Sequence, residues 1–199
     1  MKSPVEPPDD GKPKTIGKLI PDALSELQRG LRHPKPRRGI PTTYSGVTFR
    51  SRHEASFAML FDALAWPWSY EPTDLPGYIP DFSLEFASRP LLVEIKSLEE
   101  DMDLAKSKIE CTGWTKDAAI FVTAESKILG EVYEEGLGWD RAVLAKCMVR
   151  ECLKATVISE AGRWSCRSCG AGKRDLWFAF DARQLWLNAK NNTQWRPGT

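Results

Sequence analysis

The chain has 199 residues, of which 42% are hydrophobic and 28% are charged, and its formal net charge is +1. This length suffices for one globular domain with its own core and for one small appended module. A nearly balanced charge excludes a uniformly basic surface, so any affinity for nucleic acid must come from local patches. The sequence contains neither an apolar run long enough to cross a bilayer nor the apolar segment of a signal peptide. We therefore expect a cytoplasmic protein that has no membrane partner.

Residues 1–39 form an extension before the expected core. Its opening is rich in proline and charged residues and cannot bury much apolar surface, so we expect it to be disordered. Residues 21–32 have leucines at helical spacing, which predicts one short amphipathic helix. The segment HPKPRR at residues 33–38 is basic and extended. It is either a solvated linker or an arm that contacts phosphates.

A helix is predicted from Arg52 to about Ala65, because apolar side chains recur at helical spacing and Ser51 suits the N-cap. Glu54 lies in the first turn, at the end of the apolar stripe, and two roles are open for its carboxylate. It can complete a capping box by reaching back to the Ser51 amide, or it can face a functional site. The stripe comprises Phe57, Ala58, Phe61 and Leu64.

The segment WPWSYEP predicts a strand, and GYIPDFSLEFASRPLLVEIKS after it contains two short runs of alternating apolar residues. Strict alternation predicts half-buried strands, and the polar connection between the runs is short enough for an antiparallel hairpin. If Phe86 pairs with Leu91, Asp81 lies opposite Lys96. Asp81, Glu94 and Lys96 then share one face of the sheet, with aliphatic side chains on the other.

Two carboxylates on neighbouring strands repel each other unless a cation lies between them. Hard oxygen ligands of this kind suit Mg²⁺ or Mn²⁺. A lysine two residues beyond the second carboxylate can orient a metal-bound water or ease its deprotonation. A bound metal ion can promote hydrolysis of a phosphodiester, because it polarises a phosphoryl oxygen and activates water. The grouping of Asp81, Glu94 and Lys96 therefore predicts this chemistry.

Pro80-Asp81, followed after a spacer by Glu94-Ile95-Lys96, resembles the signature of the PD-(D/E)XK nuclease superfamily. The longer runs YSGVTFRSRHEASFAMLFDAL, WSYEP and GYIPDF resemble the small phage and bacterial members, over roughly a quarter of the chain. The resemblance implies an α/β fold with a restriction-endonuclease-like core, in which a mixed β-sheet is flanked by helices. It also implies a Mg²⁺-dependent nuclease that acts on DNA.

The same resemblance implies the roles of the site residues. Asp81 and Glu94 would bind the catalytic Mg²⁺ with the help of the Ile95 carbonyl, and Lys96 would position the attacking water. Related nucleases place an acidic residue of the first core helix beside the hairpin. This favours a catalytic role for Glu54, as a ligand of a second ion or of a water on the first, and does not exclude capping.

Beyond the hairpin, residues 99–113 are charged and helix-prone, and AAIFVT at 118–123 predicts a buried central strand. This order of hairpin, crossover helix and buried strand is that of the nuclease core. Residues 129–138 contain three glycines and are expected to be irregular. A C-terminal helix is predicted over 181–190, with Trp186 on its packing side. The expected division is an extension over 1–39, a nuclease core over 40–140, a zinc-ribbon-like module over 141–180, and a C-terminal helix and tail over 181–199.

Four cysteines form two close pairs, Cys147-x4-Cys152 and Cys166-x2-Cys169. Two such pairs separated by a strand, a turn and a return strand can close a tetrahedral zinc site, and a site made only of thiolates is structural. The alternatives are free buried cysteines for the first pair and a redox pair for the second. Cys111 is left over and is expected to pack as a small apolar residue.

Arginines flank both candidate sites. Arg50 and Arg52 lie at the start of the predicted helix, and Arg163 and Arg167 surround the second cysteine pair with Trp164 between them. These side chains can bind DNA phosphates beside an aromatic platform, or they can simply be solvated.

The combined expectation is a metal-dependent deoxyribonuclease, an endonuclease that serves phage or mobile-element DNA processing, recombination or repair. A homodimer is a further expectation, because junction-resolving relatives coordinate two cuts. The first alternative is a non-catalytic, zinc-dependent DNA-binding subunit of a transposition, repair or packaging complex. The second is a structural protein in which Glu54 caps its helix and Lys96 forms an ion pair with Asp81.

Overall fold

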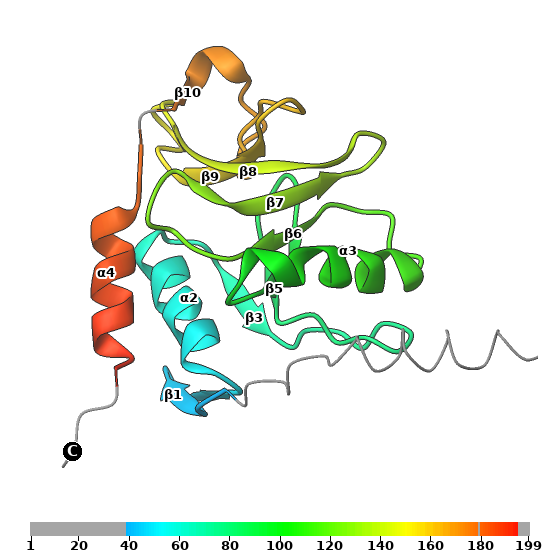
Figure 1. The fold of residues 1–199 in the computed structure, drawn as a ribbon. Coiled ribbons are helices and arrows are strands. Elements are labelled where there is room, and N and C mark those ends of the chain that lie inside the picture. Colours follow the sequence, from blue (N-terminus) through cyan, green and yellow to red (C-terminus); the bar gives the residue numbers. More distant parts are fainter. Residues whose placement is uncertain (1–38, 179, 195–199) are drawn as a thin grey trace, which may run out of the picture. The chain divides into compact units, whose positions relative to one another are not determined.

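The computed structural model describes residues 39–178 and 180–194, and these form a mixed α/β fold around one large mixed sheet (Figure 1). The strands are ordered β10-β8-β7-β6-β5-β4-β3, and β9 pairs with β8 off this path. Strands β5 and β6 are parallel and the other pairs are antiparallel. The strands are β3 (Trp68–Tyr70), β4 (Phe82–Leu84), β5 (Leu91–Ile95), β6 (Ala118–Phe121), β7 (Ile128–Glu134), β8 (Gly138–Cys147), β9 (Ala155–Ser159) and β10 (Leu176–Trp177).

Helices cover both faces of this sheet, and the alternation of strand residues decides which side chain meets which helix. Val93 of β5 packs in the cluster that contains Trp186, whereas its neighbour Leu92 packs in the cluster that contains Ile109. Helices α2 and α4 therefore cover one face and α3 covers the other, as the predicted alternation requires. The described helices are α2 (Arg52–Ala63), α3 (Met102–Cys111) and α4 (Arg183–Asn192), with the 3₁₀ turns η2 (Glu99–Asp101) and η3 (Lys173–Asp175). A separate hairpin joins β1 (Thr42–Tyr44) to β2 (Val47–Phe49).

The predicted helices of the core are confirmed. Helix α2 begins after the Ser51 N-cap, as expected, and ends two residues earlier than predicted. Trp186 and Ala189 form the buried side of α4. The hydroxyls of Ser56 and Thr193 lie 2.7 Å apart and join the two helices. No described helix is long and apolar enough to cross a membrane.

The predicted register of the central hairpin is wrong by two residues. Leu84, not Phe86, pairs with Leu91, and the ladder continues through Ser83 with Leu92. Extending this register by one residue places Asp81 across from Glu94. Because a slip of two residues preserves the side-chain faces, the expected grouping of acidic side chains survives the error.

The slip has a cause that is distant in sequence. The connection between β4 and β5 is longer than a tight turn, since the backbone N–H groups of Ser88 and Arg89 both donate to the carbonyl of Arg167, at 2.9 and 3.1 Å. Pro90 has no N–H with which to extend the ladder. The loop is thus held by the cysteine region and not by local pairing.

The prediction that residues 129–138 are irregular is also wrong. Residues 129–134 belong to β7 and Gly138 begins β8; these strands pair antiparallel from Ile128 with Val143 to Glu134 with Gly138, and residues 135–137 form the turn between them. The expected boundary between the core and the cysteine module, after residue 140, consequently falls inside β8. The predicted helix over 21–32 and the basic segment 33–38 lie outside the described residues.

Gly130 lies within β7 and not in a loop, and its backbone conformation requires glycine. Its φ is +147°, and a Cβ added there would lie 2.1 Å from the Ile120 carbonyl oxygen of the neighbouring strand. Glycine thus allows the close approach of β7 to β6, beside a register shift in the pairing of β7 with β8. We expect Gly130→Ala to lower the free energy of unfolding by about 1–3 kcal/mol. Urea denaturation measures this, with Gly136→Ala as the control, because Gly136 also has a positive φ but no atom within 4 Å of an added Cβ.

Candidate functional site

The predicted acidic residues share one depression of about 430 Å³. Helix α2 contributes Glu54 in its first turn, Asp81 directly precedes β4, Glu94 lies in β5 and Lys96 directly follows it. Asp81, Glu94 and Lys96, which were expected to share one face of the sheet, all line this depression, and Glu54 reaches it from the helix. The depression is also lined by Arg50, Gly77, Tyr78, Ile79, Ile95 and Lys108.

Asp81 is the most constrained of the carboxylates. One oxygen accepts a hydrogen bond from the Ile95 backbone N–H at 2.8 Å, and the other accepts from the Arg50 guanidinium at 2.8 Å. Its side chain is only 6% exposed. Burial and the neighbouring Glu94 carboxylate raise the pKa of Asp81 to about 7, and together they outweigh the Ile95 hydrogen bond and the positive charge of Lys96.

Glu94 has one satisfied and one unsatisfied oxygen. Its Oε1 forms an ion pair with the ammonium of Lys96. Its Oε2 is buried and has no hydrogen-bond partner among the described residues. A buried carboxylate oxygen without a partner is costly, so this atom marks a place where a cation or a donor would be stabilising.

Tyr78 is a site residue that the sequence analysis missed. Its hydroxyl is also buried without a hydrogen-bond partner among the described residues, and it lines the same depression. Burial, the charge of Glu94 and the approach of the Glu94 carboxylate to the hydroxyl raise the pKa of Tyr78, so the phenol stays neutral and is a potential donor to Glu94. The available signal was its position three residues before Asp81, in a loop between two short strands.

Glu54 has the local role that the capping pattern predicted, with one difference. The Ser51 hydroxyl donates to Oε1 at 2.7 Å, and the Glu54 N–H donates to that hydroxyl at 3.2 Å. Its Oε2 accepts from the Tyr70 hydroxyl at 2.7 Å and from the Arg50 amide at 3.1 Å, not from the Ser51 amide. Both oxygens thus have donors in this structure, and the catalytic role of Glu54 stays a prediction.

His53 supports the end of β5. Its Nε2 lies 3.1 Å from the carbonyl oxygen of Lys96 and 3.0 Å from that of Val122. Since both partners are acceptors, Nε2 carries the hydrogen and donates. Burial lowers the pKa of His53 despite these bonds, so the ring is neutral. Sequence reasoning did not anticipate this contact, because it joins residues far apart in the chain.

Protein cations already neutralise part of the acidic cluster. Arg50 binds both Asp81 and Glu71, the latter at 3.1 Å, and Lys96 binds Glu94. The structural alternative pairs Lys96 with Asp81. The observed register places Glu94, not Lys96, opposite Asp81, so this ion pair does not form. Among the described residues, the four cysteines form the one group of three or more potential ligands that is close enough to hold a metal ion.

Arg167 does not lie where a DNA contact requires it. Its side chain is fully buried, with its guanidinium 2.6 Å from Asp117 and 3.5 Å from Glu134 and its Nε donating to the Val157 carbonyl. This corrects the expectation that Arg167 binds phosphates. Two buried acids require a buried cation, so the arginine is part of the core.

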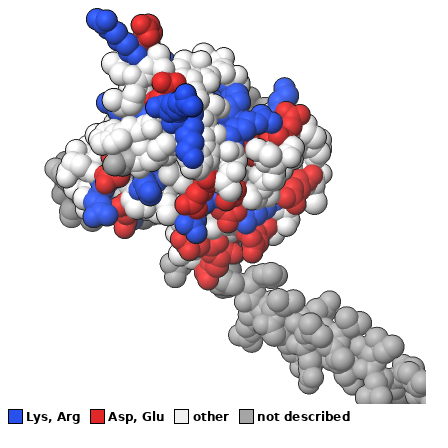
Figure 2. Space-filling view, turned by 90° about the horizontal axis from the view of Figure 1, so that it is seen from above, with Lys and Arg blue, Asp and Glu red and all other residues white. Residues whose placement is uncertain are grey.

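The other arginines remain accessible. Arg163 is exposed and donates to the Glu135 carbonyl, Arg52 is half-buried, and the Arg50 side chain is 58% exposed. On the face drawn in Figure 2, basic and acidic side chains are interspersed. Any DNA affinity must therefore come from local groups, as the composition indicated.

The four predicted cysteines converge at the end of the sheet. Cys147 ends β8, Cys152 lies in the turn before β9, and Cys166 and Cys169 lie in the loop after it. All four sulfur atoms lie within 4.8 Å of one another, with Cys147 3.6 Å from Cys169 and Cys152 3.8 Å from Cys166. Tetrahedral zinc with Zn–S bonds of about 2.3 Å would separate its sulfurs by about 3.8 Å, far more than a disulfide.

Backbone hydrogen bonds shape the segment that carries the second cysteine pair. The Gly170 N–H donates to the Cys166 carbonyl at 2.8 Å and closes a tight turn. Burial favours the neutral thiol of Cys166, but hydrogen bonds from the N–H groups of Cys169 and Ser168 outweigh it and lower the pKa of this thiol. The return strand expected between the two cysteine pairs does not form, and a single bridge joins Ser165 to Gly172.

No family model matches the sequence, and neither a curated protein nor a solved structure shows detectable similarity to it. The resemblance to the PD-(D/E)XK superfamily accordingly depends on its sequence motifs alone and stays a prediction.

The raised pKa of Asp81 predicts a pH dependence of stability in EDTA. The folded carboxyl has a pKa of about 7, whereas the ordinary pKa of an aspartate is 3.8, so the folded state binds more protons and stability falls as the pH rises through this range. We expect Asp81→Asn to raise the melting temperature by a few degrees at pH 8, and the difference to vanish near pH 4. Calorimetry at both pH values measures this; a gain that is equal at both values would contradict the assigned pKa.

Proposed function

We propose that this protein is a metal-dependent deoxyribonuclease with a restriction-endonuclease-like core. The observation that carries the proposal is the juxtaposition of two buried carboxylates, Asp81 and Glu94, across β4 and β5, with Glu94 Oε2 lacking any partner among the described residues. The β5–α3–β6 crossover between parallel strands supports the assignment of the core.

The donor set fits a hard divalent cation. Asp81, Glu94 and the Ile95 carbonyl would hold Mg²⁺ or Mn²⁺, since carboxylate and carbonyl oxygens are the ligands these ions prefer. When bound, the ion supplies Lewis-acid polarisation of the phosphoryl oxygen and a more acidic water. Lys96 would orient the attacking water and offset charge that develops on the phosphate. Tyr78 can donate a hydrogen bond within the same depression.

A structural zinc ion at the four cysteines is part of the proposal. The thiol pairs lie at separations that suit tetrahedral Zn²⁺, and a four-thiolate set leaves no open position for catalysis. This ion would hold the segment that carries Arg167, and with it the loop between β4 and β5.

A second candidate function is a non-catalytic, zinc-dependent DNA-binding subunit. The ion pairs of Arg50 with Asp81 and of Lys96 with Glu94 favour it, because a cluster neutralised by its own cations does not need a divalent ion. DNA is the partner in both cases. The nuclease proposal also includes a homodimer that acts in a host cytoplasm, in phage or mobile-element DNA processing.

Cleavage assays separate the two functions. Linear, circular, single-stranded and four-way-junction DNA are incubated with the protein and Mg²⁺, Mn²⁺ or EDTA. The nuclease proposal expects products that require a divalent ion, and the pattern of substrates reports whether the cut is internal. Binding of DNA without turnover under all conditions would favour the subunit.

A further inference from the structure

A second cavity, of about 490 Å³, lies on the same face of the sheet as the acidic depression. Leu92 of β5 and its partner Ser83 of β4 line it. Glu94 is two residues further along β5 and so points to the same side, about 7 Å away along the strand. Tyr78 of the acidic depression and Trp114 of the cavity pack against one apolar cluster that contains Leu92. The two hollows are therefore neighbours.

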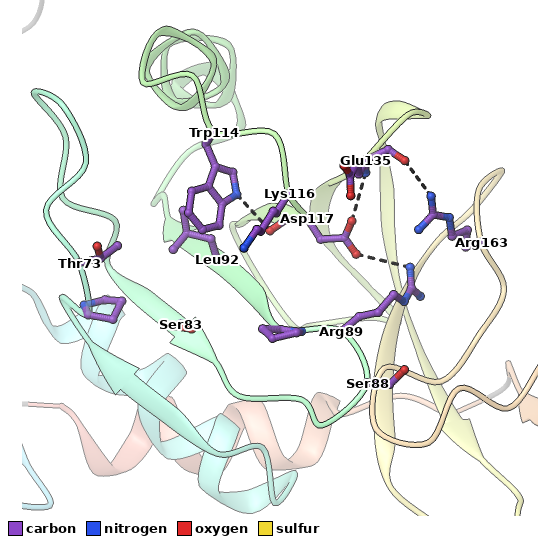
Figure 3. Close-up of a pocket in the computed structure, with 12 residues that line it drawn as sticks. Thr73, Ser83, Ser88, Arg89, Leu92, Trp114, Lys116, Asp117, Glu135 and Arg163 are labelled. Carbon is purple, nitrogen blue, oxygen red and sulfur yellow. Dashed lines mark hydrogen bonds and ion pairs between the residues drawn. The ribbon is translucent and has the colours of Figure 1, made fainter.

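The cavity combines an aromatic wall with basic groups (Figure 3). Trp114 stands beside Leu92, and the Lys116 side chain extends next to them. Arg89 and Arg163 line the cavity beyond Lys116. Its volume lies in the range of pockets that hold small organic ligands, about 300–1,000 Å³.

Two acids line the cavity, and Asp117 is paired with protein cations, whereas Glu135 contributes only its backbone N–H and carbonyl to hydrogen bonds among the described residues. The Asp117 carboxylate accepts from Arg167 at 2.6 Å, from Arg89 at 3.4 Å and from the Glu135 N–H at 3.1 Å. Lys116, in contrast, is exposed and has no ion pair or side-chain hydrogen bond within the described part of the chain. An anionic ligand would therefore meet an uncommitted ammonium group beside an aromatic ring.

We infer that this cavity binds one nucleotide of the substrate strand, with its base against Trp114 and its phosphate against Lys116. The inference deepens the proposed function and depends on it for the identity of the substrate. An aromatic side chain beside a cation is the arrangement with which proteins bind unpaired nucleotides, because every base has a face that can stack. A strand that crosses the acidic depression would reach the cavity within one or two nucleotides.

The test measures binding without cleavage. Fluorescence anisotropy follows a labelled single-stranded oligodeoxynucleotide that binds the full chain in EDTA. Trp114→Leu is expected to weaken binding about tenfold, and Trp114→Phe, which keeps an aromatic face, to retain most of the affinity. Trp177→Leu is the matched control, since Trp177 is 48% exposed and lines neither hollow.

The salt dependence of binding tests the phosphate contact. Lys116→Gln is expected to reduce the slope of log K against log salt by about 0.7, the value for one phosphate contact on a single strand. Lys154→Gln is the control, because Lys154 is exposed and lines neither hollow. A structural role of Lys116 would leave the slope unchanged.

The outcomes separate this inference from the nuclease proposal. Binding by the parent that is unaffected by Trp114→Leu overturns the inference, whether or not the protein cleaves DNA. Absence of oligonucleotide binding by the parent also overturns it. Binding that depends on Trp114 and Lys116 supports it, even if no metal ion supports cleavage and the nuclease proposal fails. If thymidine monophosphate, at the same concentration as the oligonucleotide, displaced it completely, the cavity would be a site for a free nucleotide. That result would overturn the assignment to a strand.

Discussion

Glu94→Gln is expected to lower Mg²⁺-dependent cleavage of DNA by about a thousandfold or more, because a loss of several kcal/mol of transition-state stabilisation follows from losing a metal ligand. The substitution keeps the size of the side chain and removes its charge. The melting temperature in EDTA should not fall, since the change relieves repulsion with Asp81 and the partly exposed Lys96 can turn to solvent. Initial rates on the preferred substrate measure the effect.

The control is Glu85→Gln, which removes an exposed carboxylate from the same hairpin, outside the depression. Its cleavage rate should equal that of the parent. Equal products from Glu94→Gln and the parent would show that the activity belongs to a contaminant. A Mg²⁺-dependent rise in the melting temperature of the parent that Glu94→Gln lacks would support direct binding of the ion, independently of turnover.

The parts of the fold that were predictable are those that local patterns determine. The Ser51 cap and the apolar stripe predicted α2, because both depend on residues within a few turns of each other. Alternation around Glu94 predicted which side chains of the hairpin share a face, and the cysteine spacing predicted the cluster at the end of the sheet. In each case the residues that carry the pattern also make the contacts.

The errors arise where distant residues decide the local structure. The register between β4 and β5 depends on hydrogen bonds to the Arg167 carbonyl, almost eighty residues away. The sequence around Arg167 predicts a surface cation, whereas in the fold Asp117 and Glu134 pair with it in the core. Gly130 was interpreted as a loop residue because only the neighbouring strand reveals why a side chain is excluded there. Tyr78 and His53 were missed for the same reason.

Cys169→Ser is expected to remove the bound metal and to lower the melting temperature by about 10 °C or more. Structural zinc contributes about 10–16 kcal/mol in small zinc fingers, and a loss of about 4 kcal/mol already corresponds to such a shift in a chain of this size. Cys169 is exposed, so the loss of sulfur costs little packing. Elemental analysis should find one zinc per parent chain and much less in the variant.

Cys111→Ser is the matched control, because Cys111 lies outside the cluster and is also exposed, which corrects the expectation that it packs as a small apolar residue. It should retain the metal and the melting temperature of the parent.

A further measurement locates the effect of the metal within the fold. The N–H groups of Ser88 and Arg89 donate to the carbonyl of Arg167, which lies between Cys166 and Cys169. Removal of the metal should therefore speed hydrogen exchange at Ser88 and Arg89, at the far end of the hairpin that carries the acidic residues. A parent protein without zinc, whose melting temperature does not respond to chelators, would instead show that the four cysteines are free thiols packed together.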